Sequence, residues 1–222
     1  MSWSELSDWW LEELASDPAY EEVVTPLLLD VFSPEVGHRY LDLGSGEGRL
    51  INAVTERGST VHGVELNEQL AAHSGAVVVV AALPDLDFLR PDSYEGAYCV
   101  LALEHIPDHQ TFFDGVGRIV KKGGVLAVVM NHPIWTAPGS TPITDTDGEV
   151  LWRPGDYFSD GKTEEPAGSA KVTFYHRSTS DLLNSASESG WTLEQMIERP
   201  HHEIEDQAGI PRLLACRWRL RD

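Results

Sequence analysis

Acidic residues and closely spaced glycines occur together in residues 42–48, and residues of these types can hold a nucleoside. Asp42 interrupts a short apolar run, and Gly44, Gly46 and Gly48 follow at alternate positions. Glycine lets the backbone turn sharply and lets a ligand approach it closely, and the amides that open the next helix face into the turn. Glu65 lies 17 residues beyond Gly48, at the end of the next expected strand, where its carboxylate could accept hydrogen bonds from both hydroxyls of a ribose.

The spacing of the glycines and the acids beside them separates two classes of cofactor. A dinucleotide fingerprint reads G-x-G-x-x-G, and its backbone embraces a pyrophosphate at a helix N-terminus. Here the glycines are evenly spaced, and Asp42 and Glu47 would repel a pyrophosphate. Two carboxylates suit a ligand with an ammonium and a sulfonium group, so the residues favour S-adenosylmethionine over NAD. An oxidoreductase that binds NAD(P), or a non-catalytic protein that keeps this fold, stays open as an alternative.

The elements that position these residues alternate between strands and helices. We expect strands at residues 39–43, 60–65, 76–80, 94–101, 125–130, 191–197 and 212–219, and helices at 47–57, 67–73, 108–121 and 178–189, with Gly123-Gly124 ending the third of these helices. Apolar strands that alternate with helices indicate a parallel sheet covered on both faces. In such a doubly wound sheet a ligand binds beyond the carboxyl ends of the strands, where the strand order reverses.

Residues 41–48 resemble the first motif of the class I S-adenosylmethionine-dependent methyltransferases that act on small molecules. Further resemblances follow in Val61-His62-Gly63-Val64-Glu65-Leu66-Asn67, in Tyr94-Glu95-Gly96-Ala97-Tyr98 with Leu101-Ala102-Leu103-Glu104-His105-Ile106-Pro107-Asp108, and in Ile119-Val120-Lys121-Lys122-Gly123-Gly124-Val125-Leu126. The match covers residues 40 to 130 with gaps. It implies a Rossmann-like, mostly parallel sheet of seven strands whose last strand is antiparallel.

The resemblance also implies a role for each matching position. Asp42 would lie near the methionine amine of the cofactor, directly or through water. It further implies that the backbone of Gly44, Ser45 and Gly46 contacts the cofactor and that Glu65 binds its ribose. Leu66 would pack on the adenine, and Leu101 and Ala102 would line the methionine end. The chain departs from the family at residues 81–83, where Ala81-Ala82-Leu83 replaces an acid that often holds the adenine amino group. That contact is expected from the backbone of Ala82 or Leu83, or from Asp85.

His105 is the candidate general base. It follows the fourth expected strand, where the methyl acceptor should lie, and histidine titrates near neutral pH. A structural role in orienting the loop is the alternative. Tyr98, Glu104 and His176 are weaker candidates. His201 and His202, with Glu203 and Glu205, match a solvated loop better than a metal site, so no metal is expected.

The composition limits the partners. The chain has 36 acidic and 16 basic residues and a formal net charge of −20. Nucleic acid and anionic membrane both need a basic surface, so the expected partner is a small-molecule acceptor. Cys99 and Cys216 show no metal spacing and are expected to be buried and reduced. No secretory signal begins the sequence, which favours a cytoplasmic protein. The oligomeric state is open.

The chain reads as a single α/β domain in four parts. Residues 1–37 form an N-terminal helical lid to which Tyr20 and the tryptophans contribute, and residues 38–130 form the cofactor-binding core. Residues 131–171, rich in Pro, Gly, Asp and Thr, form an irregular acceptor cap. Residues 172–222 supply a helix and the last two strands. The interpretation is methyl transfer from S-adenosylmethionine to a small molecule at oxygen or nitrogen.

Overall fold

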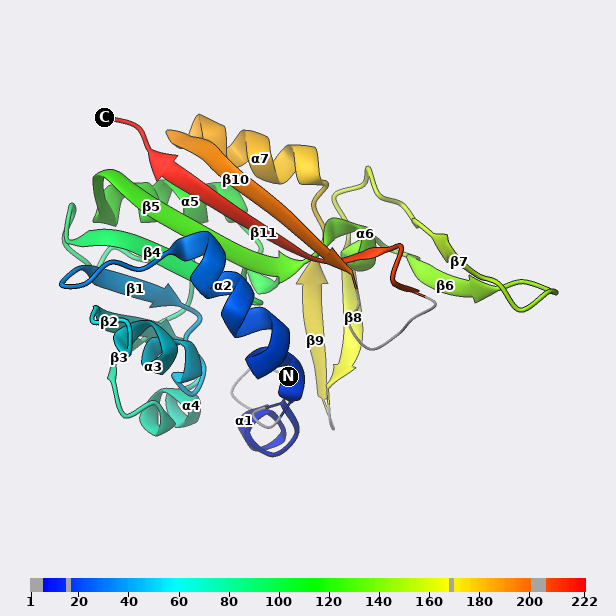
Figure 1. Cartoon of the computed structure of the whole chain (residues 1–222), viewed down its shortest axis with the longest axis horizontal. Coiled ribbons are helices and arrows are strands. Elements are labelled where there is room, and N and C mark those ends of the chain that lie inside the picture. The colour runs from blue at the N-terminus through cyan, green and yellow to red at the C-terminus, as the bar shows by residue number, and fades with distance from the viewer. Residues whose placement is uncertain (1–5, 15–16, 168–169, 201–206) are drawn as a thin grey trace.

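A central sheet of seven strands organises the molecule. The computed structural model describes residues 6–14, 17–167, 170–200 and 207–222. In spatial order the strands are β10 (Trp191–Pro200), β11 (Pro211–Leu220), β5 (Val120–Asn131), β4 (Tyr94–Val100), β1 (Arg39–Leu43), β2 (Thr60–Glu65) and β3 (Val77–Val80) (Figure 1). Only β11 runs against the others, because it pairs antiparallel with both β5 and β10. The expected seven-stranded, mostly parallel sheet is confirmed.

The strand order reverses at β1. From β1 the chain moves outward through β2 to β3, and then crosses to β4 on the other side of β1. Tyr40 of β1 therefore has Val61 as its neighbour on one side and Gly96 on the other. The carboxyl ends of β1, β2 and β4 meet at this reversal, which is where a doubly wound sheet binds its ligand.

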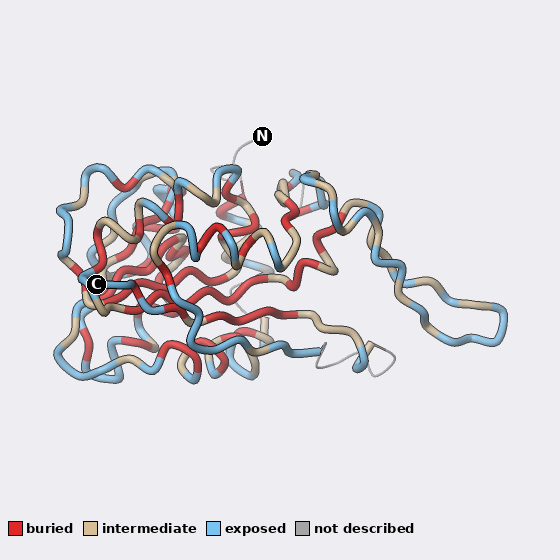
Figure 2. Tube along the Cα trace, turned by 90° about the horizontal axis from the view of Figure 1, so that it is seen from above, coloured by how far each residue is buried: buried red, intermediate tan, exposed pale blue. Residues whose placement is uncertain are grey.

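Helices cover both faces of the sheet. On one face, α2 (Thr25–Phe32) and α3 (Arg49–Thr55) pack their apolar side chains against Tyr40 and its neighbours. On the other face, α5 (His109–Ile119) and α7 (Thr179–Glu188) pack against Leu41 and Leu43. The faces alternate along β1 because successive side chains of a strand point to opposite sides. Figure 2 shows the buried backbone concentrated between these layers.

Two elements differ in detail from the sequence prediction. The helix expected at 108–121 ends at Ile119, because Val120 is already extended and pairs with Tyr94 of β4. Gly123 and Gly124 therefore lie within β5, at an irregularity of the strand where Gly123 has a φ of +73°. The expectation that these glycines stop the helix is wrong.

The N-terminal segment forms short helical pieces beside the carboxyl edge of the sheet. They are α1 (Ser7–Trp9), η2 (Trp10–Leu14), η3 (Tyr20–Val24) and α2. The η2 and η3 segments are π-helical, a wide form that is rare and frequently found at functional sites. The spacing of apolar residues predicts helix here, but it does not distinguish the two forms.

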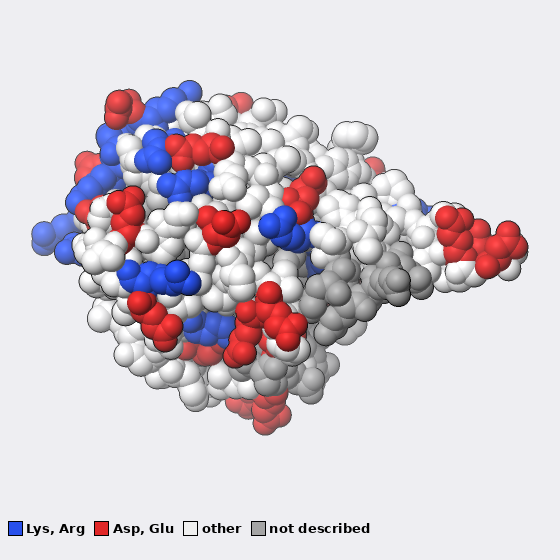
Figure 3. Space-filling model, viewed as in Figure 1, with Lys and Arg blue, Asp and Glu red and all other residues white. Residues whose placement is uncertain are grey.

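The segment 131–171 is more ordered than its composition indicates. It contains α6 (Pro133–Thr136) and two antiparallel hairpins, β6 (Thr141–Thr144) with β7 (Val150–Arg153) and β8 (Lys162–Ala167) with β9 (Ala170–Tyr175), whose last residues run past 171. The remaining helix, α4 (Glu68–His73), lies beside β2 and β3. The strand β8 reads Lys-Thr-Glu-Glu-Pro-Ala, which lacks an apolar alternation, so the sequence did not predict it. The β6–β7 hairpin projects from the body, and acidic side chains gather at its end (Figure 3).

No helix within the described ranges is long and apolar enough to cross a membrane. Both cysteines, Cys99 of β4 and Cys216 of β11, are buried thiols in the sheet, as expected.

Candidate active site

The loop between β1 and α3 is shaped by its glycines. Gly44, Gly46 and Gly48 all have positive φ, at +83°, +53° and +84°. A Cβ at Gly44 would lie 2.6 Å from the Cβ of Ala102, so the loop packs directly against the end of β4. A Cβ at Gly46 would meet nothing nearer than the indole nitrogen of Trp10, at 3.8 Å. Glycine is therefore required at residue 44 for packing as well as for conformation.

A cavity lies over this loop at the carboxyl edge of the sheet. Its walls come from the N-terminal segment, the glycine loop and the ends of β2, β3 and β4. Of the residues expected at the site, the cavity brings together Gly44, Ser45, Gly46, Glu65, Leu66, Leu83, Leu101, Ala102 and His105. Asp42 does not line it. Residues without a role in the sequence analysis also contribute, among them Arg49, Leu50, Leu70, Ala81, Val100 and Ile106.

Glu65 pins the glycine loop to the end of β2. Its Oε2 accepts a hydrogen bond of 2.8 Å from the amide of Gly46, and its Oε1 accepts one of 2.8 Å from the amide of Asn67. Burial raises the pKa of Glu65, and the amide donors oppose that shift. Each carboxylate oxygen can accept a second hydrogen bond. Glu65 can thus hold the loop and still bind the hydroxyls of a ligand in the cavity.

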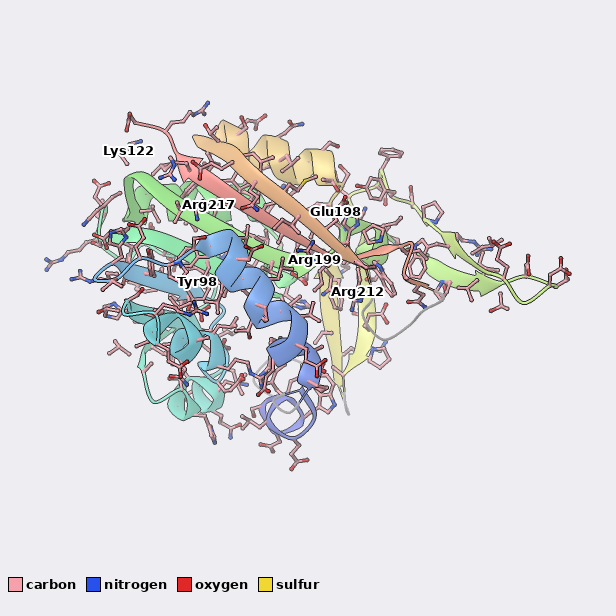
Figure 4. The ribbon with its side chains drawn as sticks, viewed as in Figure 1. Tyr98, Lys122, Glu198, Arg199, Arg212 and Arg217 are labelled. Atoms are coloured by element: carbon pink, nitrogen blue, oxygen red, sulfur yellow. The ribbon has the colours of Figure 1, made fainter. Side chains whose placement is uncertain are left out.

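Asp42 lies in the sheet beneath the loop, 1% exposed. Its register neighbour on β4 is Tyr98, which Figure 4 labels. The ring of Tyr98 packs against that of Phe32 of α2. Within the described residues, neither oxygen of Asp42 nor the hydroxyl of Tyr98 has a well-aligned hydrogen-bond partner. Burial raises the pKa of Asp42 well above its ordinary value, while the nearby Tyr98 hydroxyl opposes the shift and the charge of Glu65 adds to it. A buried carboxyl of this kind is stabilised as an anion by a cationic ligand nearby.

The N-terminal segment is fastened to the glycine loop through Glu47. The indole Nε1 of Trp10 donates to Oε2 of Glu47 at 2.7 Å, and Nε of Arg49 donates to Oε1 at 2.7 Å. The guanidinium carbon of Arg49 lies 4.6 Å from the ring centroid of Tyr20. Tyr20 and Trp10 line the cavity, and their role in a lid stays a prediction. The sequence analysis gave Glu47 a ligand-facing role, whereas here it joins two parts of the protein.

His105 belongs to a short 3-10 turn, η4 (Leu103–His105), that follows β4. Its Nδ1 lies 2.8 Å from the carbonyl oxygen of Thr173 on β9, and its ring centroid lies 4.6 Å from that of Phe174. A carbonyl oxygen only accepts hydrogen bonds, so Nδ1 carries the proton and the neutral ring has its lone pair on Nε2. That tautomer is the one a general base at Nε2 requires.

A buried arginine holds the turn that carries His105. The guanidinium of Arg177 donates to the carbonyl oxygens of Leu103 at 3.2 Å, of Pro107 at 2.9 Å and of Ile106. Arg177 is 6% exposed and follows β9. The side chain of Arg177, just after β9, therefore binds backbone carbonyl groups of a turn that lies 70 to 74 residues earlier in the sequence. Sequence spacing gives no signal for such a contact.

The weaker candidates lie away from the cavity lining. His176 is 2% exposed, with Nδ1 3.0 Å from the Thr136 hydroxyl and Nε2 2.8 Å from the carbonyl oxygen of Tyr157. Glu104 is completely buried and accepts hydrogen bonds from the backbone amide and side-chain amide of Asn131. These contacts connect the cap to the core. The sequence candidates His201, His202, Glu203 and Glu205 lie outside the described residues.

The expected adenine end of the cavity is apolar. Leu66, Ala81 and Leu83 line it, whereas Asp85 does not. Leu66 is 46% exposed, an exposure that a planar ring in the cavity would cover. A base here would pack on aliphatic side chains and take its polar contacts from the backbone.

Comparisons with known proteins agree with this geometry. Residues 41–128 match the family model of a methyltransferase domain. A ubiquinone biosynthesis O-methyltransferase from Paracidovorax citrulli is 32% identical over 129 residues, which are 52% of this chain and 53% of that protein. The chain thus spans about half the length of the curated relatives it matches.

Two solved structures extend the likeness to nearly the whole fold. A chain from Listeria monocytogenes, named as an S-adenosylmethionine-dependent methyltransferase, has a TM-score of 0.80 and 23% identity, over 90% of this chain and 100% of that one. A methyltransferase of the same kind from Mesorhizobium loti has a TM-score of 0.73 and 26% identity, over 87% of this chain and 96% of its own. Residues 41–128 are therefore similar to a methyltransferase domain, and the fold of the chain is the one that these two S-adenosylmethionine-dependent methyltransferases share.

Proposed function

We propose that this chain transfers a methyl group from S-adenosylmethionine to a small molecule, at oxygen or nitrogen. The observation that carries the proposal is that the glycine loop, Glu65 and His105 line one and the same cavity, at the reversal of strand order. The buried carboxyl of Asp42 beneath the loop suits a cationic ligand. An anionic pyrophosphate would be repelled by Asp42, Glu47 and Glu65 together.

The residues around the cavity fit the parts of this cofactor. The proposed contacts are Glu65 with the ribose, Leu66 and Leu83 with adenine, the backbone of Gly44, Ser45 and Gly46 with the chain of the cofactor, Leu101 and Ala102 with its methionine end, and Asp42 with its amine, directly or through water. When bound, the cofactor supplies a methyl group that is already activated for transfer. The protein then has two tasks, which are to align the acceptor and to remove its proton.

His105 is proposed as the general base. It lines the cavity next to Leu101 and Ala102, and its Nδ1 is held by the Thr173 carbonyl. Its Nε2 would take the proton from an acceptor hydroxyl or ammonium as the acceptor is methylated. The contacts of Arg177 with the 103–107 turn would keep the ring in place.

The acceptor is proposed to enter beside the cap segment, residues 131–171. Thr173 and Phe174 of β9 contact His105, so the β8–β9 hairpin borders the proposed base. The curated relatives are named O-methyltransferases, which favours oxygen as the methylated atom. The cap lies outside residues 41–128, which the family model matches, so that match does not identify the acceptor. A cytoplasmic location and a lack of nucleic-acid partners stay predictions from the sequence.

Calorimetry with two ligands tests the proposal. S-adenosylhomocysteine should bind and NADH should not; the reverse result would favour the oxidoreductase. Transfer of a labelled methyl group is then measured over a library of phenols, carboxylic acids and amines. Binding of S-adenosylhomocysteine without transfer to any acceptor would favour a non-catalytic protein.

A further inference from the structure

Glu104 and Arg212 carry opposite charges near the carboxyl edge of the sheet, yet they do not pair directly. Glu104 comes immediately before His105 in the η4 turn and is completely buried, and Arg212 is partly buried at the start of β11. Within the described residues neither side chain forms an ion pair. Burying a charge without a direct counter-ion is costly, so something other than stability has to account for the two charges.

Asn131 connects these two charges. Its backbone amide and its side-chain Nδ2 both donate to Oε1 of Glu104, at 3.1 Å and 2.6 Å, and its Oδ1 accepts a hydrogen bond from Nη1 of Arg212. A side-chain amide that donates at one end and accepts at the other has one orientation. Burial lowers the pKa of Arg212 and the charge of Glu104 opposes that shift, which agrees with an interaction across Asn131. Arg212, Asn131 and Glu104 thus form a hydrogen-bonded relay.

The relay begins at the cap and ends beside the proposed base. The guanidinium carbon of Arg212 lies 4.6 Å from the ring centroid of Trp135 on α6, and that ring lies 4.3 Å from the ring of Trp152 on β7. Figure 4 labels Arg212 at the start of β11, close to the cap. At its other end, Glu104 is followed directly by His105, which lines the cavity.

We propose that Arg212 is a positioning residue for methyl transfer and acts on His105 through Asn131 and Glu104. The inference rests on the proposed function, in which His105 is the general base. A base works only while its Nε2 lies within reach of the acceptor's proton, and a displacement of about 1 Å can lower a rate about a hundredfold. The relay sets the orientation of His105 relative to an acceptor held beside the cap.

The turn that carries His105 is thereby held from two sides. Arg177 and the carbonyl group of Thr173 contact the turn and the ring from the end of β9. Glu104 fastens the same turn to the end of β5. Loss of the relay should therefore loosen the ring of His105 while the contacts from β9 keep the turn folded.

Hydrogen exchange at the ring of His105 tests the inference before an acceptor is known. The Nδ1 proton is assigned by NMR in isotope-labelled protein from its absence in His105→Gln. Arg212→Gln should raise its exchange rate about five- to tenfold, which corresponds to the loss of about one hydrogen bond. Arg212→Lys, which keeps a charge and a donor, should restore part of the protection. Asn131→Ala removes the middle of the relay, should match Arg212→Gln, and decides the test if Arg212→Gln does not fold.

Arg199→Gln is the matched control. Arg199 is exposed near the same end of the neighbouring strand β10, where Figure 4 labels it, and it donates to the carbonyl oxygen of Glu198 at 3.2 Å. This variant should leave the ring proton as in the wild type. Backbone amides of β1 in the same samples report general loosening. An equal rise in their exchange and in that of the ring proton would overturn the inference, and so would an unchanged ring proton in Arg212→Gln.

Turnover separates positioning from folding once an acceptor is found. Arg212→Gln should lower kcat about ten- to a hundredfold and change KM less, with affinity for S-adenosylhomocysteine within about twofold of the wild type. Because the relay acts through His105, adding Arg212→Gln to His105→Gln should cause no further loss; a further loss would overturn the inference. Failure of the wild type to bind S-adenosylhomocysteine would overturn the proposed function instead, and the two failures are distinguishable because the ring-proton measurement uses no ligand.

Discussion

The indole of Trp10 lies against the glycine loop and donates a 2.7 Å hydrogen bond to the carboxylate of Glu47. The two residues come from the N-terminal segment and from the turn after β1. Because both line the cavity, the hydrogen bond closes one wall of the proposed cofactor site. Entry and release of a cofactor should therefore depend on this contact.

Trp10→Phe removes the donor and keeps an aromatic ring. We expect the dissociation rate of S-adenosylhomocysteine to rise by about five- to tenfold, which corresponds to the loss of one hydrogen bond to a charged acceptor partly offset by water. Stopped-flow displacement measures it. Trp152→Phe is the control, since Trp152 lies on β7 of the β6–β7 hairpin, packs on Trp135 and does not line the cavity. Equal rates in wild type and Trp10→Phe would mean that the lid does not limit release.

Asp42→Asn should change how stability depends on pH. Burial raises the pKa of Asp42 in the folded protein above its ordinary value of 3.8, so the folded state binds the proton more tightly than the unfolded state. Proton binding by Asp42 stabilises the folded state fully below about pH 3.8, the pKa of the carboxyl in the unfolded chain. This stabilisation is lost as the pH rises through the higher pKa that Asp42 has in the folded protein. In that window the wild type should lose up to about 1.4 kcal/mol per pH unit relative to Asp42→Asn. Denaturant titrations of both proteins, between about pH 5 and about pH 8, measure the difference in their free energies of unfolding. Proteins are generally most stable in about this pH range. A constant difference would contradict the prediction.

The same carboxyl should make cofactor affinity depend on pH. An ammonium near Asp42 favours its ionised form, so S-adenosylhomocysteine should bind more tightly to the wild type as the pH rises through the raised pKa of Asp42. Asp42→Asn should show a weaker affinity with a flatter pH profile. Calorimetry across the same pH range checks both. If the two profiles have the same slope, Asp42 does not face the amine.

Glu65→Ala removes an acceptor that the loop amide of Gly46 and the amide of Asn67 both use. The proposed ribose contacts disappear as well. We expect affinity for S-adenosylhomocysteine to fall by about a hundredfold or more, because charge-assisted hydrogen bonds contribute most in buried sites. Glu68→Ala, at an exposed position on α4, should leave the affinity unchanged. A Glu65→Ala protein with wild-type affinity would exclude the ribose role.

His105→Gln tests the proposed base. Once an acceptor is known, kcat should fall by about 10²- to 10⁴-fold, the usual contribution of a positioned base, while the affinity for S-adenosylhomocysteine changes by less than about twofold. His73→Gln, an exposed histidine at the end of α4, serves as the control. Wild-type turnover in His105→Gln would leave the histidine with a structural role only.

Salt should stabilise the fold. The chain carries a net charge of −20 with only 4 lysines, and a charge so far from zero destabilises the compact state through self-repulsion. Raising KCl from about 0.1 M to about 1 M shortens the Debye length from about 10 Å to about 3 Å, so the unfolding temperature should rise. Differential scanning calorimetry measures the unfolding temperature. Samples in which a neutral osmolyte replaces the added KCl serve as the comparison. A flat or falling Tm with KCl would show that the acids are already compensated.

The sequence by itself determined the layout of the sheet and the place of its loop. The features that predict it are local: alternating strand and helix patterns, glycines at 44, 46 and 48, and Glu65 at the end of a strand. Local features can be recognised from residues that are close together in the sequence. They predict the fold, and they also predict most of the residues that line the cavity. The turn-forming glycines could be found because glycine adopts the positive φ values of this loop without the strain that a Cβ causes.

Only the tertiary structure decided how the side chains around that loop are partnered. The sequence predicts Asp42 near the ligand, directly or through water, and the structure places its carboxyl in the sheet beneath the loop, beside Tyr98 of β4. Glu47 bonds Trp10 from 37 positions away, and His105 bonds the carbonyl of Thr173 from 68 positions away. Such contacts depend on which elements pack together and on how much water each group loses on folding. The spacing of residues in the sequence predicts neither. The same holds for Arg49, whose place between the loop and the lid gives the cavity its cation.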